Sequence, residues 1–264
     1  MVSRTLIAII LVPVSIIIVW VGFPWFTIFT TLLSVICAYE LVKMAQSWGD
    51  DPVIPLALVI SVGLTFSVPI IQESSTYNRA LPPVIAVFSI ISLLWLISRG
   101  NRRETCSKYV VSIAAGMFIG GCLSHVLLLR SISQGFEWTL FVMMVTFSMD
   151  TGALLVGKTI GNKPFAITIS PSKTWEGAIA GFLIAIAISI AAVHILSLNL
   201  PFWHTFILGA LIGIIGQVGD LSESKLKRIA GIKDSGKLLA GHGGLMDRLD
   251  SIIFNVIVVY YLVI

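Results

Sequence analysis

Charged residues are scarce in this sequence. Only 11% of its 264 residues are Asp, Glu, Lys or Arg, whereas 57% are hydrophobic. A soluble domain carries about 25% charged residues, so this chain has too little polar surface to face water on every side. The scarcity excludes an ordinary soluble enzyme and predicts an all-α, polytopic integral membrane protein.

Paired cysteines are also missing. Cys37, Cys106 and Cys122 have no paired spacing, and we interpret them as small apolar residues in or beside membrane spans. The sequence contains no internal repeat and no low-complexity segment. Its net charge of +4 requires no nucleic acid partner, because membrane topology accounts for most of the basic residues.

Long apolar runs, by contrast, are abundant. We predict about nine transmembrane helices, because each run approaches the ~20 residues that a helix needs to cross the hydrocarbon core. The predicted spans are residues 5–22, 25–43, 54–71, 82–98, 109–130, 137–157, 176–196, 202–220 and 248–264. The first run is too long for a signal peptide, and no small-residue cleavage site follows it, so it is counted as a membrane helix.

The basic residues fall almost entirely on one side of this arrangement. Every Lys and Arg except Arg79 and Arg130 lies on the side of the N-terminus. The positive-inside rule therefore places the N-terminus in the cytosol and the C-terminus outside the inner (cytoplasmic) membrane. We expect residues 1–135 to form an N-terminal helix bundle for packing and lipid access, and residues 136–264 to form the catalytic region.

Two cytosolic loops of the catalytic region, residues 158–175 and 221–247, are long, basic and rich in Gly, Ser and Lys. Loops of that size in compact helical bundles are usually functional or disordered. In the earlier loop we expect Ser170 and Pro171 to cap and begin the next helix. Capping does not require Lys173, Thr174 and Glu176 as well, and a lysine with hydroxyls at a helix start suits phosphate.

Small residues form two helix faces, Gly116 with Gly120, and Gly209 with Gly213 and Gly216. Such faces let another helix approach closely. Contact within the bundle and contact between subunits are equally good interpretations of both faces.

Glu40 is a charged residue near the cytosolic end of the second predicted span, and Lys43 follows three residues later. This spacing favours an ion pair on the helix surface. A role for Glu40 in a polar cavity is the alternative.

Four carboxylates collect at the cytosolic ends of the later spans. Asp150 lies roughly 10 Å short of that end of its helix, Asp220 closes one span, and Asp247 and Asp250 open the last. Mg²⁺ is typically held by one or two carboxylates, with phosphates and waters completing its shell. Helix capping would explain Asp247 and Asp250 alone, so we predict a metal site at Asp220, Asp247 and Asp250, supported by Asp150.

A glycine turn, residues 241–244, precedes the last span. Glycines let backbone approach a ligand closely, and N–H groups at a helix start attract anions. With Lys227, Arg228 and Lys233 nearby, we interpret the turn as a triphosphate cradle. We favour a phosphate or base contact for His242, since no other His is nearby, and metal ligation and helix capping are the alternatives.

Together these residues resemble the phosphatidate cytidylyltransferase family, also called CDP-diacylglycerol synthases. The family signature is met by Ser224, Leu226, Lys227, Arg228, Lys233, Asp234, Gly236, Leu239, His242, Gly243, Gly244, Leu245, Asp247, Arg248, Leu249 and Asp250. Residues 150–153 and 170–177 are similar to two further family blocks. Two departures are Ala240, where the family usually has proline, and Leu154, where an aromatic residue is common.

The resemblance, strong over residues 150–250, implies a membrane enzyme that makes CDP-diacylglycerol and pyrophosphate from CTP and phosphatidic acid. It also implies Mg²⁺, a second, monovalent cation such as K⁺, a homodimer, and cations held by Asp220 and Asp247. The predicted catalytic residues are Asp220, Asp247, Asp250, Lys227, Arg228 and Lys233. The predicted substrate-binding residues are Ser170, Lys173, Thr174, Glu176, Ser224, Asp234, His242, Gly243, Gly244 and Arg248.

Two other functions compete with this prediction. A lipid or polyprenol kinase would also act on lipid phosphate, and the choice of nucleotide would separate it from a cytidylyltransferase. A transporter places its polar groups near the bilayer midplane, open to both sides, whereas the charges here gather on one side.

Overall fold

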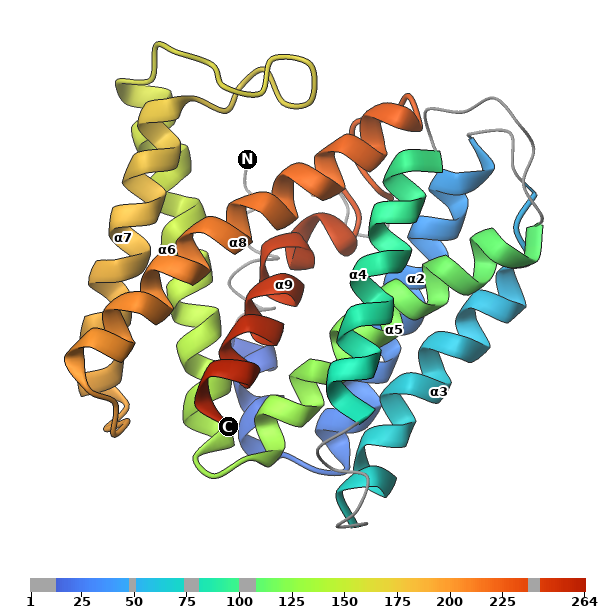
Figure 1. Cartoon of the computed structure of the whole chain (residues 1–264), viewed down its shortest axis with the longest axis horizontal. Helices are drawn as coiled ribbons and strands as arrows, with labels where there is room; N and C mark the ends of the chain where they lie inside the picture. Colours follow the sequence, from blue (N-terminus) through green and yellow to red (C-terminus); the bar gives the residue numbers. More distant parts are fainter. Residues whose placement is uncertain (1–12, 48–50, 74–80, 100–107, 237–242) are drawn as a thin grey trace. The chain divides into compact units, whose positions relative to one another are not determined.

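The structure, a computed structural model, describes residues 13–47, 51–73, 81–99, 108–236 and 243–264. Its helices are α2 (Trp25–Gln46), α3 (Ile54–Glu73), α4 (Leu81–Arg99), α5 (Lys108–Ser131), α6 (Gly135–Thr159), α7 (Trp175–Ile195), α8 (Phe202–Ile229) and α9 (Met246–Val263), and residues 13–21 are helical as well. The described residues form no β-strand. The all-α prediction is confirmed for this part of the chain (Figure 1).

Within the part of the chain that the structure describes, six helices are long and apolar enough to cross a membrane, namely α2, α4, α5, α6, α7 and α8. Helix α3 has a shorter apolar part, Ile54–Pro69, and α9 coincides with the last predicted span. The first predicted span begins among residues outside the described ones. These helices fit an integral membrane protein, and the count of nine spans stays a prediction.

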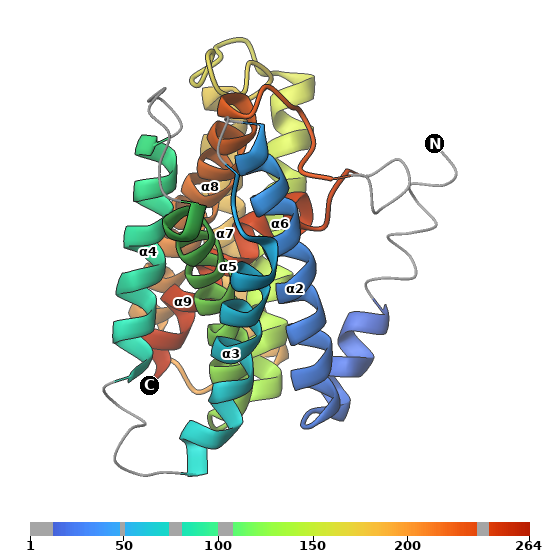
Figure 2. The ribbon, with the colours of Figure 1, turned by 90° about the vertical axis from the view of Figure 1, so that its right-hand side faces the viewer.

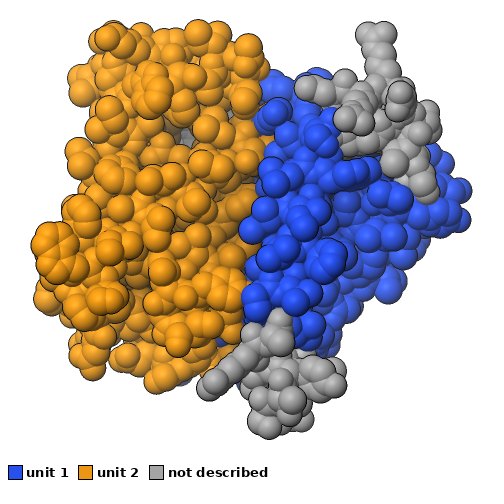
Figure 3. Space-filling model, viewed as in Figure 1, with its two compact units in different colours: residues 1–128, 225–249 blue, residues 129–224, 250–264 orange. Residues whose placement is uncertain are grey.

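The chain forms two compact units, coloured separately in Figure 3. Unit 1 contains residues 1–128 and 225–249, and unit 2 contains residues 129–224 and 250–264. The later boundaries fall inside α8 and α9. The sequence divided the chain by role, into residues 1–135 for packing and lipid access and residues 136–264 for catalysis. That division stays a prediction.

Unit 1 is held together by close helix pairs. Helices α2 and α3 pack side by side (Figure 2), and α5 packs against α3 through the predicted small-residue face. A Cβ atom at Gly120 would lie 2.6 Å from Cα of Ser61, and one at Gly116 would lie 2.7 Å from the carbonyl oxygen of Ala57. This glycine face therefore serves contact within the unit.

Unit 2 is built on α6 and α7, which lie side by side (Figure 1). Helix α8 joins them through the second glycine face, since a Cβ at Gly209 would lie 2.8 Å from Cα of Ile186 in α7. At Gly216 the nearest side chain is Asn255 of α9. Both predicted faces thus pack inside the units that contain them.

Helix α7 begins at Trp175, next to the start of the predicted span at residue 176, but it does not use the predicted cap. Its N-cap is Thr174, whose hydroxyl accepts the N–H of Gly177 at 3.2 Å, so the prediction that Ser170 caps the helix is wrong. The carbonyl of Ser170 instead accepts the N–H of Lys173 at 3.1 Å. Proline favours the second position of such a turn, so Pro171 belongs to the loop before the helix.

Helix α8 continues past its predicted end at residue 220 to Ile229. Residues 221–229 carry charges, but Leu226 among them is completely buried. A charged helical segment with an apolar residue on one side can bury that side and expose its charges. The second predicted loop therefore begins near residue 230 rather than at 221.

Candidate functional site

A cavity of about 340 Å³ lies among α6, α7, α8 and the loop that joins α6 to α7, all in unit 2. The predicted site residues that line it are Asp150, Ser170, Lys173, Thr174 and Asp220. Lys158, Ser172 and Gln217 also line it, and none of these was predicted. The structure thus brings two carboxylates, two lysines and several hydroxyl groups together around one cavity.

The loop before α7 is folded back on itself, which fixes Lys173 at the cavity. The N–H of Phe165 donates to the carbonyl of Lys173 at 3.1 Å, and the N–H of Trp175 donates to that of Lys163 at 2.9 Å. The carboxylate of Glu176 accepts the N–H of Lys163 at 3.3 Å. Glu176 therefore shapes the loop, and its assignment to substrate binding stays a prediction.

An ion pair joins the loop to α8. The Nζ atom of Lys173 lies 2.7 Å from Oδ2 of Asp220, with side-chain exposures of 23% and 33%. The hydroxyl of Ser224 donates to Oδ1 of Asp220 at 3.4 Å, and that of Ser251 donates to Asp150 at 3.4 Å. Because Lys173 lines the cavity and its side chain is partly exposed, an anion that enters the cavity can reach its ammonium group.

Asp247 is the centre of a second network, in unit 1. Its Oδ1 lies 2.6 Å from Nζ of Lys227, and its Oδ2 accepts the N–H groups of Ser235 at 2.9 Å and Gly244 at 2.8 Å. The side chains of Lys227 and Asp247 are 12% and 10% exposed. Three donors thus hold the Asp247 carboxylate at the start of α9.

The backbone of the glycine turn depends on Gly243. Its φ of +84° lies in the left-handed region, and a Cβ there would lie 2.6 Å from Oδ2 of Asp247. The following N–H groups, of Gly244, Leu245 and Met246, all donate to carboxylates. In this respect the turn differs from the predicted phosphate cradle, since side chains of the protein occupy these three donors.

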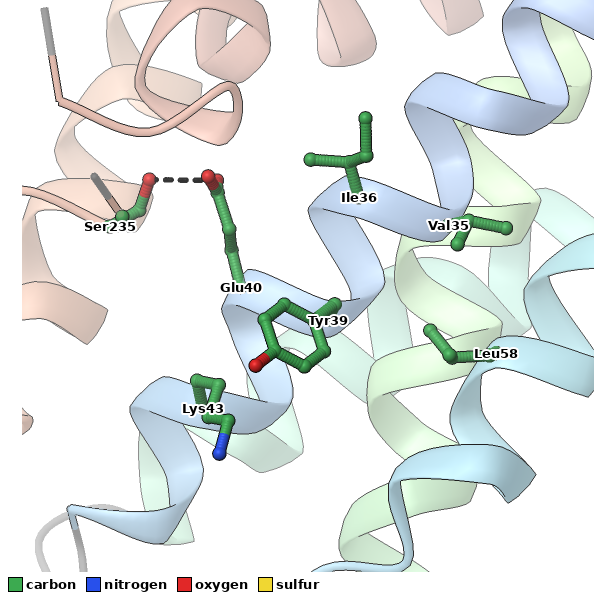
Figure 4. A pocket seen from close by; sticks show the side chains of 8 residues that line it. Val35, Ile36, Tyr39, Glu40, Lys43, Leu58 and Ser235 are labelled. Atoms are coloured by element: carbon green, nitrogen blue, oxygen red, sulfur yellow. Dashed lines mark hydrogen bonds between the residues drawn. The ribbon is translucent and has the colours of Figure 1, made fainter. Parts of the chain in front are cut away.

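The second carboxylate at this helix start is Glu40 of α2. It is 5% exposed and accepts hydrogen bonds from Ser235, Leu245 and Met246. Figure 4 shows its carboxylate pointing toward Ser235, whereas Lys43 points away and stands 5.6 Å over the ring of Tyr39. The favoured interpretation of a surface ion pair between Glu40 and Lys43 is therefore wrong, because burial and the loop's donors orient the side chain inward.

Glu40 also lines a second cavity, of about 360 Å³, within unit 1 (Figure 4). The other lining residues are Val35, Ile36, Tyr39, Lys43, Leu58, Ser235 and Gly236. The alternative that the sequence left open for Glu40 was a role in a polar cavity. The side chain does line a cavity, but the lining is largely apolar, so a polar role there stays a prediction.

Four other predicted residues, Arg228, Lys233, Asp234 and Arg248, are exposed residues of unit 1. Asp250, in unit 2, accepts the N–H of Ser251 at 2.8 Å. His242 and Ala240 lie outside the described residues.

Known proteins resemble this chain over almost its whole length. Residues 2–264 match the model of the Cytidylyltransferase family. The chain belongs to the cytidylyltransferase family. The resemblance inferred from residues 150–250 is thereby confirmed and extends to the N-terminal helices.

Several relatives in this family are named phosphatidate cytidylyltransferase. The one from Bacillus subtilis (strain 168) is 34% identical over 179 residues, covering 67% of this chain and 66% of the relative. The one from Staphylococcus haemolyticus (strain JCSC1435) is 30% identical over 253 residues, covering 95% and 94%. A relative from Staphylococcus saprophyticus is 31% identical over 252 residues, with the same coverage.

The carboxylates of this family member fit a cation that is shared with a ligand. Among the described residues, no group of three His, Cys, Asp or Glu side chains could hold a metal ion by itself. Mg²⁺ is usually bound through one or two carboxylates plus substrate phosphates and water. Asp220 and Asp247 each hold an ammonium group at 2.7 and 2.6 Å, so each presents the oxygen atoms and charge that a cation requires.

Sequence reasoning did not assign three polar residues of these networks to the site. Glu40 was left with two interpretations, a surface ion pair and a role in a polar cavity, although a carboxylate within an apolar span is costly and usually functional. Glu223, 2% exposed, lies one turn after Asp220 in α8. Gln217 lies one turn before it, and its Nε2 donates to the carbonyl of Ala178 at 3.0 Å. Helical spacing from Asp220 was the signal for the last two.

Proposed function

We propose that this protein transfers the cytidylyl group of CTP to phosphatidic acid, giving CDP-diacylglycerol and pyrophosphate. Membership of the cytidylyltransferase family and the relatives named phosphatidate cytidylyltransferase support this function. The structural observation that carries it is the cavity of unit 2, where Lys173 is paired with Asp220 beside Asp150. Its volume of about 340 Å³ lies in the range of small-molecule sites, roughly 300–1,000 Å³.

The reaction is an in-line displacement at phosphorus. An oxygen of the lipid phosphate forms a bond to the α-phosphorus of CTP, and the bond from that phosphorus to the β-phosphate oxygen breaks as pyrophosphate leaves. A phosphate monoester with a second pKa of about 6 is already mostly dianionic at pH 7. The nucleophile therefore needs no general base.

Bringing two anions together is the difficult part of this reaction. Fixed cations lower that barrier by stabilising charge as it develops. We assign phosphate contacts to Lys173 in unit 2 and to Lys227, Arg228 and Lys233 in unit 1. The hydroxyls of Ser170 and Thr174, which line the same cavity as Lys173, donate hydrogen bonds to phosphate oxygens.

Mg²⁺ belongs to the same proposal, with Asp220, Asp247 and Asp250 as its protein ligands and Asp150 in support. When bound, the ion neutralises negative charge on the phosphate oxygens. Lys173 and Lys227 are the ammonium groups paired with two of these carboxylates, and both are assigned to phosphate contacts. A monovalent cation such as K⁺ stays part of the proposal through the family resemblance alone.

A turnover assay on purified protein tests the reaction. Phosphatidic acid and Mg²⁺ are supplied with each of the four NTPs in turn, and lipid product and pyrophosphate are followed together. CTP, or its deoxy form, should give CDP-diacylglycerol and an equal amount of pyrophosphate, and the other nucleotides should give neither. Release of a nucleoside diphosphate with a phosphorylated lipid would replace this function by a lipid kinase.

We further propose nine spans in the cytoplasmic membrane, with the N-terminus and the active site in the cytosol, and a homodimer. The distribution of Lys and Arg supports the orientation. Single cysteines at Asn162 and Asn199, both exposed, test it in a cysteine-free background. In intact spheroplasts an impermeant maleimide should label Asn199→Cys and leave Asn162→Cys unlabelled until the membrane is opened. The reverse pattern would invert the topology.

A further inference from the structure

Glu40 is a buried carboxylate to which the transfer reaction as proposed gives no role. It lies on α2 and is 5% exposed. Its Oε2 accepts the hydroxyl of Ser235 at 3.0 Å and the N–H of Met246 at 2.9 Å, and its Oε1 accepts the N–H of Leu245 at 3.0 Å. These partners are 195 to 206 residues away in the sequence. Glu40 thus ties α2 directly to the loop before α9 (Figure 4).

The energetics of this arrangement favour a fixed loop. An ionised carboxylate taken out of water is costly unless hydrogen bonds replace its hydration. Here two of the three donors are the backbone N–H groups of Leu245, just before α9, and Met246, its first residue. N–H groups at a helix start have no partner within the helix. The positive end of the helix dipole also favours an anion at that point. The charge of Glu40 and the start of α9 therefore stabilise each other.

Asp247 shares this set of donors with Glu40. The N–H of Gly244 goes to Asp247, and the next two N–H groups go to Glu40. Ser235 serves both, since its N–H donates to Asp247 and its hydroxyl to Glu40. The backbone that orients the Asp247 carboxylate is thus held in place by Glu40.

The space around Glu40 is also restricted to very small neighbours. A Cβ at Gly244 would lie 2.6 Å from Oε2 of Glu40, and a Cβ at Gly236 would also overlap the carboxylate. Glycine at these two positions lets the loop close directly around the side chain. The contact is therefore built from both sides of the loop.

We infer that Glu40 is a positioning residue for cytidylyl transfer, which acts by holding the loop that orients Asp247. This inference rests on the proposed function. It predicts that Glu40 affects the rate per folded molecule as well as folding, because displacement of the Asp247 carboxylate weakens its assigned contact with the cation. Outer partners of metal ligands typically contribute roughly 10- to 100-fold to activity.

The test compares Glu40→Gln with Glu137→Gln. Gln has the shape of Glu, but it has only one acceptor oxygen. In either orientation of the amide, the N–H of Leu245 or that of Met246 therefore faces a nitrogen that cannot accept it. Glu137, in the first turn of α6, provides the same chemical change outside both networks. We expect Glu40→Gln to lower kcat for CDP-diacylglycerol by roughly 10- to 100-fold and to raise the Mg²⁺ concentration for half-maximal rate. Glu137→Gln should leave both unchanged.

Hydrogen exchange supplies a readout that does not depend on turnover. The amides of Leu245 and Met246 should exchange faster in Glu40→Gln and at the normal rate in Glu137→Gln. Unchanged exchange would overturn the inference, and so would faster exchange with an unchanged kcat and Mg²⁺ requirement, which would leave Glu40 a purely structural role. An inactive wild-type protein would instead remove the proposed function, whatever the exchange pattern.

A milder variant keeps the inference testable if Glu40→Gln does not fold. Ser235→Ala removes only the hydroxyl donor and leaves both backbone donors on Glu40. It should lower kcat severalfold with little change in the thermal unfolding midpoint. A wild-type kcat in Ser235→Ala, combined with failure of Glu40→Gln to fold, would count against a positioning role.

Discussion

Replacing Asp247 with Asn should lower kcat for CDP-diacylglycerol by at least ~100-fold while the protein stays folded. The side chain keeps its size, but its amide nitrogen faces donors. Oδ1 now lies 2.6 Å from Nζ of Lys227, and Oδ2 accepts two N–H groups, so neither orientation of the amide satisfies all three. Loss of the charge also removes the assigned contact with Mg²⁺. Steady-state kinetics over a range of Mg²⁺ concentrations would measure the change.

Lys227→Met provides the matched control for Asp247→Asn, since it breaks the same ion pair from the other side. It removes a cation assigned to phosphate but leaves the Asp247 carboxylate in its backbone cradle. We expect Lys227→Met to lower kcat/KM for CTP with an unchanged Mg²⁺ requirement, whereas Asp247→Asn should raise that requirement. Near-wild-type activity of Asp247→Asn would exclude Asp247 from the metal site.

The composition of the sequence predicted the helical architecture, because an apolar run of membrane length has few alternatives to a helix. Helix ends were harder to predict. At residue 170 a Ser-Pro pair is typical of both a cap and a turn, and the fold uses Thr174 as the cap. Near residue 221 the charges suggested a loop, but the buried face of Leu226 continues α8 to Ile229.

The candidate site was predictable where its residues have a recognisable local setting. Asp150 and Asp220 were chosen as carboxylates toward the cytosolic end of the spans, and Lys173 as a lysine at a helix start, and all three line the cavity of unit 2. Glu40 could not be paired by sequence spacing, because its hydrogen-bond partners are about 200 residues away. Local rules compare a helical residue with neighbours three or four positions along, and these rules selected Lys43.

The second large effect is expected for Lys173→Met, which should lower kcat/KM for CTP by roughly 100-fold. The substitution removes the ammonium 2.7 Å from Asp220 and leaves that carboxylate, 33% exposed, facing the cavity without its cation. A triphosphate would then meet the negative charge of Asp220 without its paired ammonium. Kinetics with varied CTP at saturating phosphatidic acid would measure the change.

Two companion variants separate charge at this position from charge in the loop. Lys163 is an exposed lysine of the same loop that does not line the cavity, so Lys163→Met should leave kcat/KM within about twofold of wild type. Lys173→Arg keeps the positive charge and should recover part of the loss, although a planar guanidinium does not replace an ammonium at a close ion pair. Equal effects of Lys163→Met and Lys173→Met would contradict a specific phosphate contact, because only the net charge of the loop would then matter. A loss confined to Lys173, and partly reversed by Arg, would place the transferred phosphates beside Asp220 in the cavity of unit 2.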